Sequence, residues 1–126
     1  QHQLNSAGAI LQTVTLGSQS FFPAFDGANI WVPNLPSSSV SVVRASNGVV
    51  LATLTGNGIN APEQAAFDGE RVLVTNNGGG SVSVWKAADL SEIGNFFMPV
   101  SQLPRGACSD GINFWITLQN DLLARF

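Results

Sequence analysis

Charged side chains are scarce in this sequence, at 10% of its 126 residues, with five Lys and Arg against eight Asp and Glu. Proteins that bind a nucleic-acid backbone neutralise its phosphates with clustered Lys and Arg, and five such residues are too few for us to expect that here. No run of about 18 apolar residues occurs, so we expect no membrane-spanning helix. The sequence predicts neither a nucleic acid nor a membrane as a partner.

Cysteine and histidine are each present once, as Cys108 and His2. A single cysteine excludes an internal disulfide and a zinc site built from cysteines. His2 precedes every motif described below, which leaves no expected base for a nucleophilic serine or cysteine. We therefore expect no catalytic residue, no metal and no cofactor.

What the sequence does contain is a unit repeated every 42 residues. Such self-similarity is typical of repeat folds. An Asp-Gly motif recurs at this spacing as Phe25-Asp26-Gly27, Phe67-Asp68-Gly69 and Ser109-Asp110-Gly111. Each copy is followed by an apolar pair at the same spacing: Trp31-Val32, Leu73-Val74 and Trp115-Ile116. Three units of 42 residues account for all 126 residues, so we expect a single repeat domain over residues 1–126.

Each unit is typical of four short antiparallel strands, which in the middle unit we expect at 64–67, 71–75, 81–86 and 91–97. The Asp-Gly pairs mark hairpin turns, so Asp26, Asp68 and Asp110 are interpreted as turn residues rather than paired acids. The second strand of each unit is apolar on both faces, as in Val72-Leu73-Val74. Such a strand belongs in a sheet that is covered on both sides, as in radially stacked blades.

The repeat resembles the bacterial β-propeller repeats related to NHL-type and lactonase-like propellers. The resemblance is carried best by Phe25, Asp26, Gly27, Ile30, Trp31, Val32, Asn34, Val40, Val42, Ala45, Ser46, Gly48 and Leu51. It weakens in the third unit, where Leu118 replaces the asparagine. The resemblance implies an all-β propeller with three four-stranded blades per chain, at about 17–55, 56–97 and 98–126. It implies no particular activity, because a fold does not determine function.

The third unit stops after its third expected strand, while an extra strand-like segment at 7–16 resembles 46–54. We expect this N-terminal strand to complete the last blade of a neighbouring chain. Propellers have about four to eight blades, so three are too few to close a ring. A homodimer would form a six-bladed ring, whereas a trimer would give nine blades. A β-trefoil or β-prism monomer is the alternative fold class.

The candidate ligand-binding residues are mostly amides expected in the loops along one rim of the propeller. Loops on a rigid scaffold commonly carry binding residues, although asparagine also serves loop geometry. We expect Cys108 to be buried like Ala66, and Trp85 to be more exposed than the other tryptophans and able to stack on a ligand. The candidates are Asn34, Asn57, Asn60, Asn76, Asn77, Asn120 and Trp85, with Glu63 and Arg105 nearer the axis.

These residues favour a non-enzymatic recognition module that binds a neutral polar ligand, either a glycan or a protein surface. One alternative is a structural or assembly component of a cell surface or virion. A second alternative is a lactonase- or lyase-like metal-dependent enzyme with an ion near Glu63. The abundance of Ser, Asn and Gly, with Lys86 as the only lysine, suits an extracellular or cell-surface protein.

Overall fold

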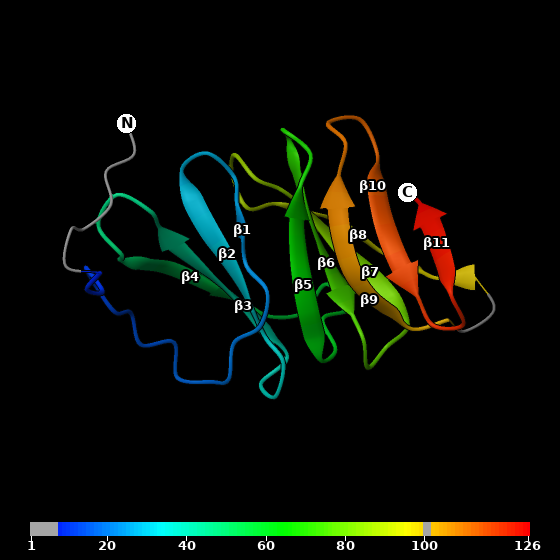
Figure 1. The fold of residues 1–126 in the computed structure, drawn as a ribbon, viewed down its shortest axis with the longest axis horizontal. Helices are drawn as coiled ribbons and strands as arrows, with labels where there is room; N and C mark the ends of the chain where they lie inside the picture. Colours follow the sequence, from blue (N-terminus) through cyan, green and yellow to red (C-terminus); the bar gives the residue numbers. More distant parts are fainter. Residues whose placement is uncertain (1–7, 100–101) are drawn as a thin grey trace.

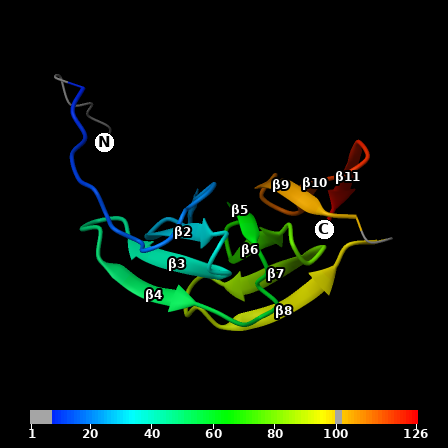
Figure 2. The same cartoon turned by 90° about the horizontal axis from the view of Figure 1, so that it is seen from below.

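The computed structural model describes residues 8–99 and 102–126, and these form three antiparallel sheets arranged side by side in an arc (Figures 1 and 2). The strands of the first sheet are β1 (Ala24–Phe25), β2 (Asn29–Asn34), β3 (Ser39–Arg44) and β4 (Val50–Leu54). The second comprises β5 (Pro62–Phe67), β6 (Arg71–Asn76), β7 (Ser81–Lys86) and β8 (Glu92–Phe97). The third comprises β9 (Pro104–Ser109), β10 (Phe114–Leu118) and β11 (Leu122–Arg125).

Strand order follows chain order in every sheet, so each unit is an up-and-down meander from inner to outer strand. This arrangement is that of propeller blades, and it excludes the β-trefoil and β-prism alternatives. Two of the sheets have four strands, as expected from the repeat, and the third has three among the described residues. No helix in the described part of the chain is long and apolar enough to cross a membrane.

The core lies between the sheets, in two apolar layers. In the first layer Trp31, Val40 and Val42 of the first sheet pack against one face of the second sheet, including Val72 and Val74. In the second layer the opposite face of the second sheet packs against the third sheet through Ala66, Leu73, Val82, Val84, Phe114, Ile116 and Leu118. Burial on both faces explains why the second strand of each unit lacks apolar–polar alternation.

The third unit is shifted by one residue relative to the second. Leu73 pairs with Val84 in the second sheet, whereas the equivalent Trp115 pairs with Arg125 in the third. The cause is a shorter turn, since 119–121 connects β10 to β11 where 77–80 connects β6 to β7. As a result Phe126 exchanges two backbone hydrogen bonds with Phe114 and packs against the core layer.

The N-terminal segment forms no strand in the single chain between residues 8 and 16, and residue 7 lies outside the described residues. Its donation to a neighbouring chain stays a prediction.

The two ends of each sheet carry different turns. We call the edge that carries the β2–β3, β6–β7 and β10–β11 turns and the β4–β5 and β8–β9 connections the rim. The opposite edge, which carries the Asp-Gly turns, is called the hairpin edge.

Candidate ligand-binding rim

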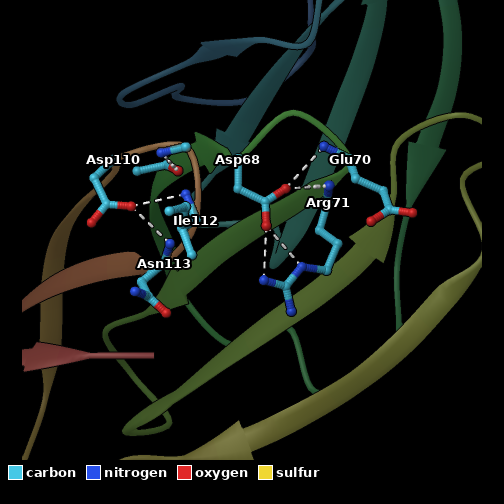
Figure 3. Close-up of polar contacts among 8 residues, drawn as sticks. Asp68, Glu70, Arg71, Asp110, Ile112 and Asn113 are labelled. Carbon is cyan, nitrogen blue, oxygen red and sulfur yellow. Dashed lines mark hydrogen bonds and ion pairs between the residues drawn. The ribbon is translucent and has the colours of Figure 1, made fainter.

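The three Asp-Gly turns share one hydrogen-bonding pattern at the hairpin edge. Oδ1 of Asp110 accepts hydrogen bonds from the backbone N–H groups of Ile112 and Asn113, each at 2.8 Å (Figure 3). Its Oδ2 accepts the indole N–H of Trp115 at 2.9 Å. Asp26 makes the equivalent bonds to its own turn and to Trp31. The turn role predicted from the sequence is confirmed.

The middle turn replaces the tryptophan with an arginine. Leu73 stands where the other units have Trp, and the Arg71 guanidinium instead binds Oδ2 of Asp68 at 2.8 Å (Figure 3). Burial acts to raise the pKa of Asp68, but the backbone N–H groups of Arg71 and Glu70 and the guanidinium outweigh it and lower that pKa. At Asp110 the N–H of Asn113, then the indole of Trp115 and the N–H of Ile112, lower the pKa to about 2.

Two of the candidate amides are buried structural links. Asn76 is fully buried, and its Nδ2 donates to the hydroxyls of Ser81 at 3.1 Å and Ser83 at 2.8 Å. Asn34 makes the same two contacts in the first sheet, to Ser39 and Ser41. Both side chains point into the blade, where they hydrogen-bond the second strand of the blade to the third, rather than to the rim surface.

The remaining amides lie in rim loops at increasing exposure. Asn57 is half-buried with a left-handed φ of 49°, and its Nδ2 donates to the Val84 carbonyl. Asn77 is also half-buried and donates to the carbonyl of Pro104, at the start of the third blade. Asn60 is exposed, and its backbone N–H donates to Asn76 Oδ1. Asn120 is exposed and donates to Gln102 Oε1 at 3.2 Å.

Trp85 does not lie on the rim, and the expectation that it is exposed is wrong. Its side chain is 1% exposed, between the first two sheets, with its ring centroid 5.8 Å from that of Trp31. Sequence alternation could not show this, because the residue that covers Trp85 belongs to the preceding blade. Trp31 is buried as predicted, whereas Trp115 is only half-buried.

Cys108 is exposed, which corrects the expectation that it is buried like Ala66. The alignment of the two positions is right, since both lie on the same face of an inner strand. In the second sheet that face is covered by the third sheet, whereas no described segment covers it in the third. The exposure of Cys108 is a consequence of its place at the end of the arc.

Glu63 and Arg105 occupy equivalent positions on the inner strands β5 and β9, 42 residues apart. Glu63 is half-buried and Arg105 is exposed. They do not form an ion pair, because the one described salt bridge joins Arg71 and Asp68. Across 8–99 and 102–126, no three His, Cys, Asp or Glu side chains gather into a group that could hold a metal ion. His2 lies outside these residues.

The rim carries a hollow of about 450 Å³ that the sequence analysis did not identify. It is lined by Gly78, Gly79, Gly80, Phe97, Met98 and Leu103, with no charged side chain. Phe97 is 76% exposed at the end of β8. A run of three glycines before β7 was the available signal. The hollow lies at the end of the second sheet, where the Met98 N–H donates to the Gly80 carbonyl at 2.9 Å, and Leu103, just before β9, completes its lining.

The glycines allow the chain to approach closely at this hollow. A Cβ on Gly78 would lie 2.6 Å from Asn60 Oδ1 and 2.9 Å from the Ala61 Cβ, and Gly80 has a left-handed φ of 67°. Hollows of about 350 and 460 Å³ also occur at the hairpin edge, but these are lined by charged residues that include Asp26, Glu70, Lys86 and Arg44. The rim hollow is therefore the neutral one.

Comparisons with solved structures give β-propeller proteins at low sequence identity. Virginiamycin B lyase from Staphylococcus aureus, in an inactive variant solved with quinupristin, matches at 15% identity with a TM-score of 0.80, over 95% of this chain and 42% of that chain. The WD40 β-propeller domain of Doa1 matches at 13% identity with a TM-score of 0.76, over 94% of this chain and 40% of that chain. The designed protein Ika4 matches at 14% identity and a TM-score of 0.76, over 94% and 72% of the two chains.

The chain thus spans less than half the length of the natural propellers named here. No family model matches it, and no curated protein does. At these identities the likeness shows the fold alone, and propellers with this fold include both enzymes and non-enzymatic domains. Together with the sheet order and the two inter-sheet core layers, these comparisons show that the chain has a β-propeller fold.

Proposed function

We propose that this protein is a non-enzymatic, homo-oligomeric β-propeller that recognises a neutral polar ligand, a glycan, on its rim. The observation that carries the proposal is the rim hollow with its exposed Phe97. A volume of about 450 Å³ lies within the range of small-molecule sites. An aromatic ring offers a flat apolar face to a sugar, and nearby amides offer hydrogen bonds without a charge.

The amides that support this role are those at the rim surface rather than those in the blade interior. Asn60 lies against Gly78 and Gly79, and Asn77 follows β6 directly beside them. Asn34, Asn76 and Trp85 support the scaffold instead. The proposed site therefore consists of Phe97, the glycine turn and these two exposed or half-buried amides, and it suits an extracellular or cell-surface setting.

A glycan array followed by titration calorimetry tests this function. We expect the protein to bind a set of neutral oligosaccharides, and we expect Phe97→Ala to weaken that binding about fivefold, since a stacking contact contributes about 1 kcal/mol. Ile112→Ala is the matched control, because Ile112 is 78% exposed in the Asp-Gly turn of the third sheet, at the edge opposite the rim. Binding that is absent, or equal in both variants, would contradict a glycan site at the rim.

An assembly component is the second candidate, favoured by apolar side chains exposed at both ends of the arc, including Phe25 and Leu123. Its expected signature is a large ordered particle of the purified protein in electron micrographs, with no glycan bound. A discrete small oligomer that binds oligosaccharides would contradict it.

A further inference from the structure

We propose that the uncovered face of the third sheet docks against the first sheet of a second copy of this chain, whose segment 9–16 adds to β11 as a fourth strand. The inference rests on the proposed homo-oligomeric propeller and specifies the partner and the contact. We call the two contact regions the Trp115 face (Cys108, Trp115, Thr117, Leu123 and Arg125) and the Phe25 face (Phe25, Ile30, Val32 and Val43).

The Trp115 face is exposed at positions that the other sheets bury. Trp31 and Leu73, the equivalents of Trp115, are both 0% exposed, whereas Trp115 is half-buried. Ala66 is 5% exposed, whereas its equivalent Cys108 is exposed. The guanidinium of Arg125 lies 5.6 Å from the centre of the Trp115 ring, in the absence of a facing sheet among the described residues. This surface has the composition of a blade interior rather than of a blade exterior.

The Phe25 face shows the complementary pattern at the other end of the arc. Phe25 is 55% exposed, while its equivalent Phe67 is partly buried against the first core layer. Ile30 is half-buried, while its equivalent Val72 is 0% exposed. The chain has two interfaces between sheets, one between the first and second sheets and one between the second and third. In each, the face of one sheet that corresponds to the Trp115 face packs on the face of the next sheet that corresponds to the Phe25 face. Val32 and Val43 are only 8% and 7% exposed in the single chain, so Phe25 and Ile30 are the open part of the Phe25 face. This part and the Trp115 face are thus the two halves of a third interface of the same kind.

Segment 9–16 has the sequence of an outer strand but no sheet of its own. It resembles 46–54, which contains β4, and its Ile10 and Leu11 are 80% and 79% exposed. The amide of Gln12 donates to the Asn47 carbonyl at 2.9 Å, which holds the segment beside the first sheet. That is where the outer strand of a preceding blade would lie.

The edge of β11 provides the matching acceptor. Leu122 and Leu123 are 48% and 60% exposed, and β11 pairs only with β10 among the described residues. Natural sheets protect free edges with charges, prolines or bulges, whereas β11 begins with two leucines and has a charge only at its end, Arg125. Figure 1 shows the N-terminal segment and β11 at opposite ends of the arc, so one chain cannot join its own donor to its own acceptor.

Two copies satisfy every one of these requirements at once. Each copy offers one donor segment and one acceptor edge, so a two-fold pair makes both contacts reciprocally and leaves neither face open. The three sheets per chain then give six blades, a number within the range of closed propellers. A second copy is therefore the occupant that we propose for both faces.

The repeat also predicts individual contacts across this interface. The ring of Trp31 packs on that of Trp85, whose equivalent in the first sheet is Val43, so Trp115 is expected to pack on Val43 of the second copy. The hydroxyl of Thr75 donates to the Arg105 carbonyl at 2.7 Å. By the same offset, Thr117 is expected to donate to a carbonyl in the inner segment of the second copy's first sheet.

Sedimentation velocity and light scattering on the purified chain test the proposal. We expect a particle of two chains, and we expect Trp115→Arg and Phe25→Glu each to give the mass of a single chain, because each places charge in both interfaces of the pair. Ile112→Arg is the control, since it adds the same charge at a site that is 78% exposed and outside either face. This control is expected to keep two chains.

Mixing the two altered proteins separates loss of the interface from failure to fold. A pair formed by one Trp115→Arg chain and one Phe25→Glu chain contains one unaltered interface, so the mixture is expected to regain the mass of two chains. A wild-type mass of one chain, an open-ended series of larger species, or a mixture that stays monomeric would each overturn the inference. Oligosaccharide binding by a monomer would overturn the pairing but leave the proposed glycan recognition intact. A dimer that binds no oligosaccharide would support the pairing and overturn the proposed glycan recognition.

Discussion

At the scale of single residues, the aspartates of the repeat show how one side chain can define a turn. Each carboxylate accepts two backbone N–H groups with one oxygen, and with the other it accepts an indole or guanidinium. The turn role was predictable from Asp-Gly alone. The side-chain partner was not, because it is a Trp five residues later in two turns and an Arg three residues later in the middle turn.

The depressed pKa of Asp110 makes its turn sensitive to acid. A group whose pKa falls on folding stabilises the folded state above its unfolded pKa of 3.8, and that stabilisation is lost as the pH falls toward about 2. We expect Asp110→Asn to lower the Tm near neutral pH, and the difference from wild type to shrink between about pH 5 and pH 2. Thermal melts followed by circular dichroism measure it. A difference that grows on acidification would contradict the assigned hydrogen bonds.

The buried amide of Asn76 is expected to matter for stability rather than for recognition. Asn76→Ala leaves the N–H of Asn60 without its partner and removes one of the donors to the hydroxyls of Ser81 and Ser83, which Asn95 also contacts. The loss should lower the free energy of unfolding by about 2 kcal/mol. Urea denaturation measures the change. Asn113→Ala serves as the comparison, because the structure gives no hydrogen bond of the Asn113 side chain among the described residues, and it should cost less.

At the scale of elements, the strands followed from periodicity and the loops did not. The alternation of Ser and Val at 81–86 predicted β7 at its observed bounds. The hollow at the rim escaped prediction because its wall includes the connection from β8 to β9, whose course is not set by strand periodicity. The exposure of Trp85 and Cys108 was mispredicted because it depends on an adjacent sheet.

The glycine turn after β6 offers a test at this scale. Gly78→Ala places a Cβ within 3 Å of Asn60 and Ala61, whereas a Cβ on Gly79 would lie 3.3 Å from its nearest neighbour. We expect Gly78→Ala to lower the midpoint of urea unfolding and Gly79→Ala to lower it less, with a cost of about 1 kcal/mol for the former. Equal midpoints for the two variants would show that the turn relaxes freely.

At the scale of the whole molecule, the sequence predicted the propeller because the repeat is long and anchored at several positions. The number of chains in a closed ring depends on contacts outside one chain, and so it stays a proposal. In the proposed pair, burial of the apolar side chains exposed at both ends of the arc would couple stability to association. Dimers that have little stable monomer melt at temperatures that depend on protein concentration.

We therefore expect the Tm of the wild-type chain to rise as its concentration is increased, since dissociation and unfolding are coupled. Differential scanning calorimetry over a hundredfold range of concentration measures the shift. The Trp115→Arg chain is the control, and its Tm should not depend on concentration. A wild-type Tm that is constant over that range would argue against a pair held together by these faces.

The placement of the three tryptophans provides an optical reporter that needs no label. Trp31 and Trp85 are sealed against each other inside the chain, and only Trp115 borders solvent. Emission from the two inner indoles should resist acrylamide quenching whether the chain is single or paired. Any quenching that appears on dilution therefore comes from Trp115. Its amplitude measures the fraction of chains in which the Trp115 face is uncovered.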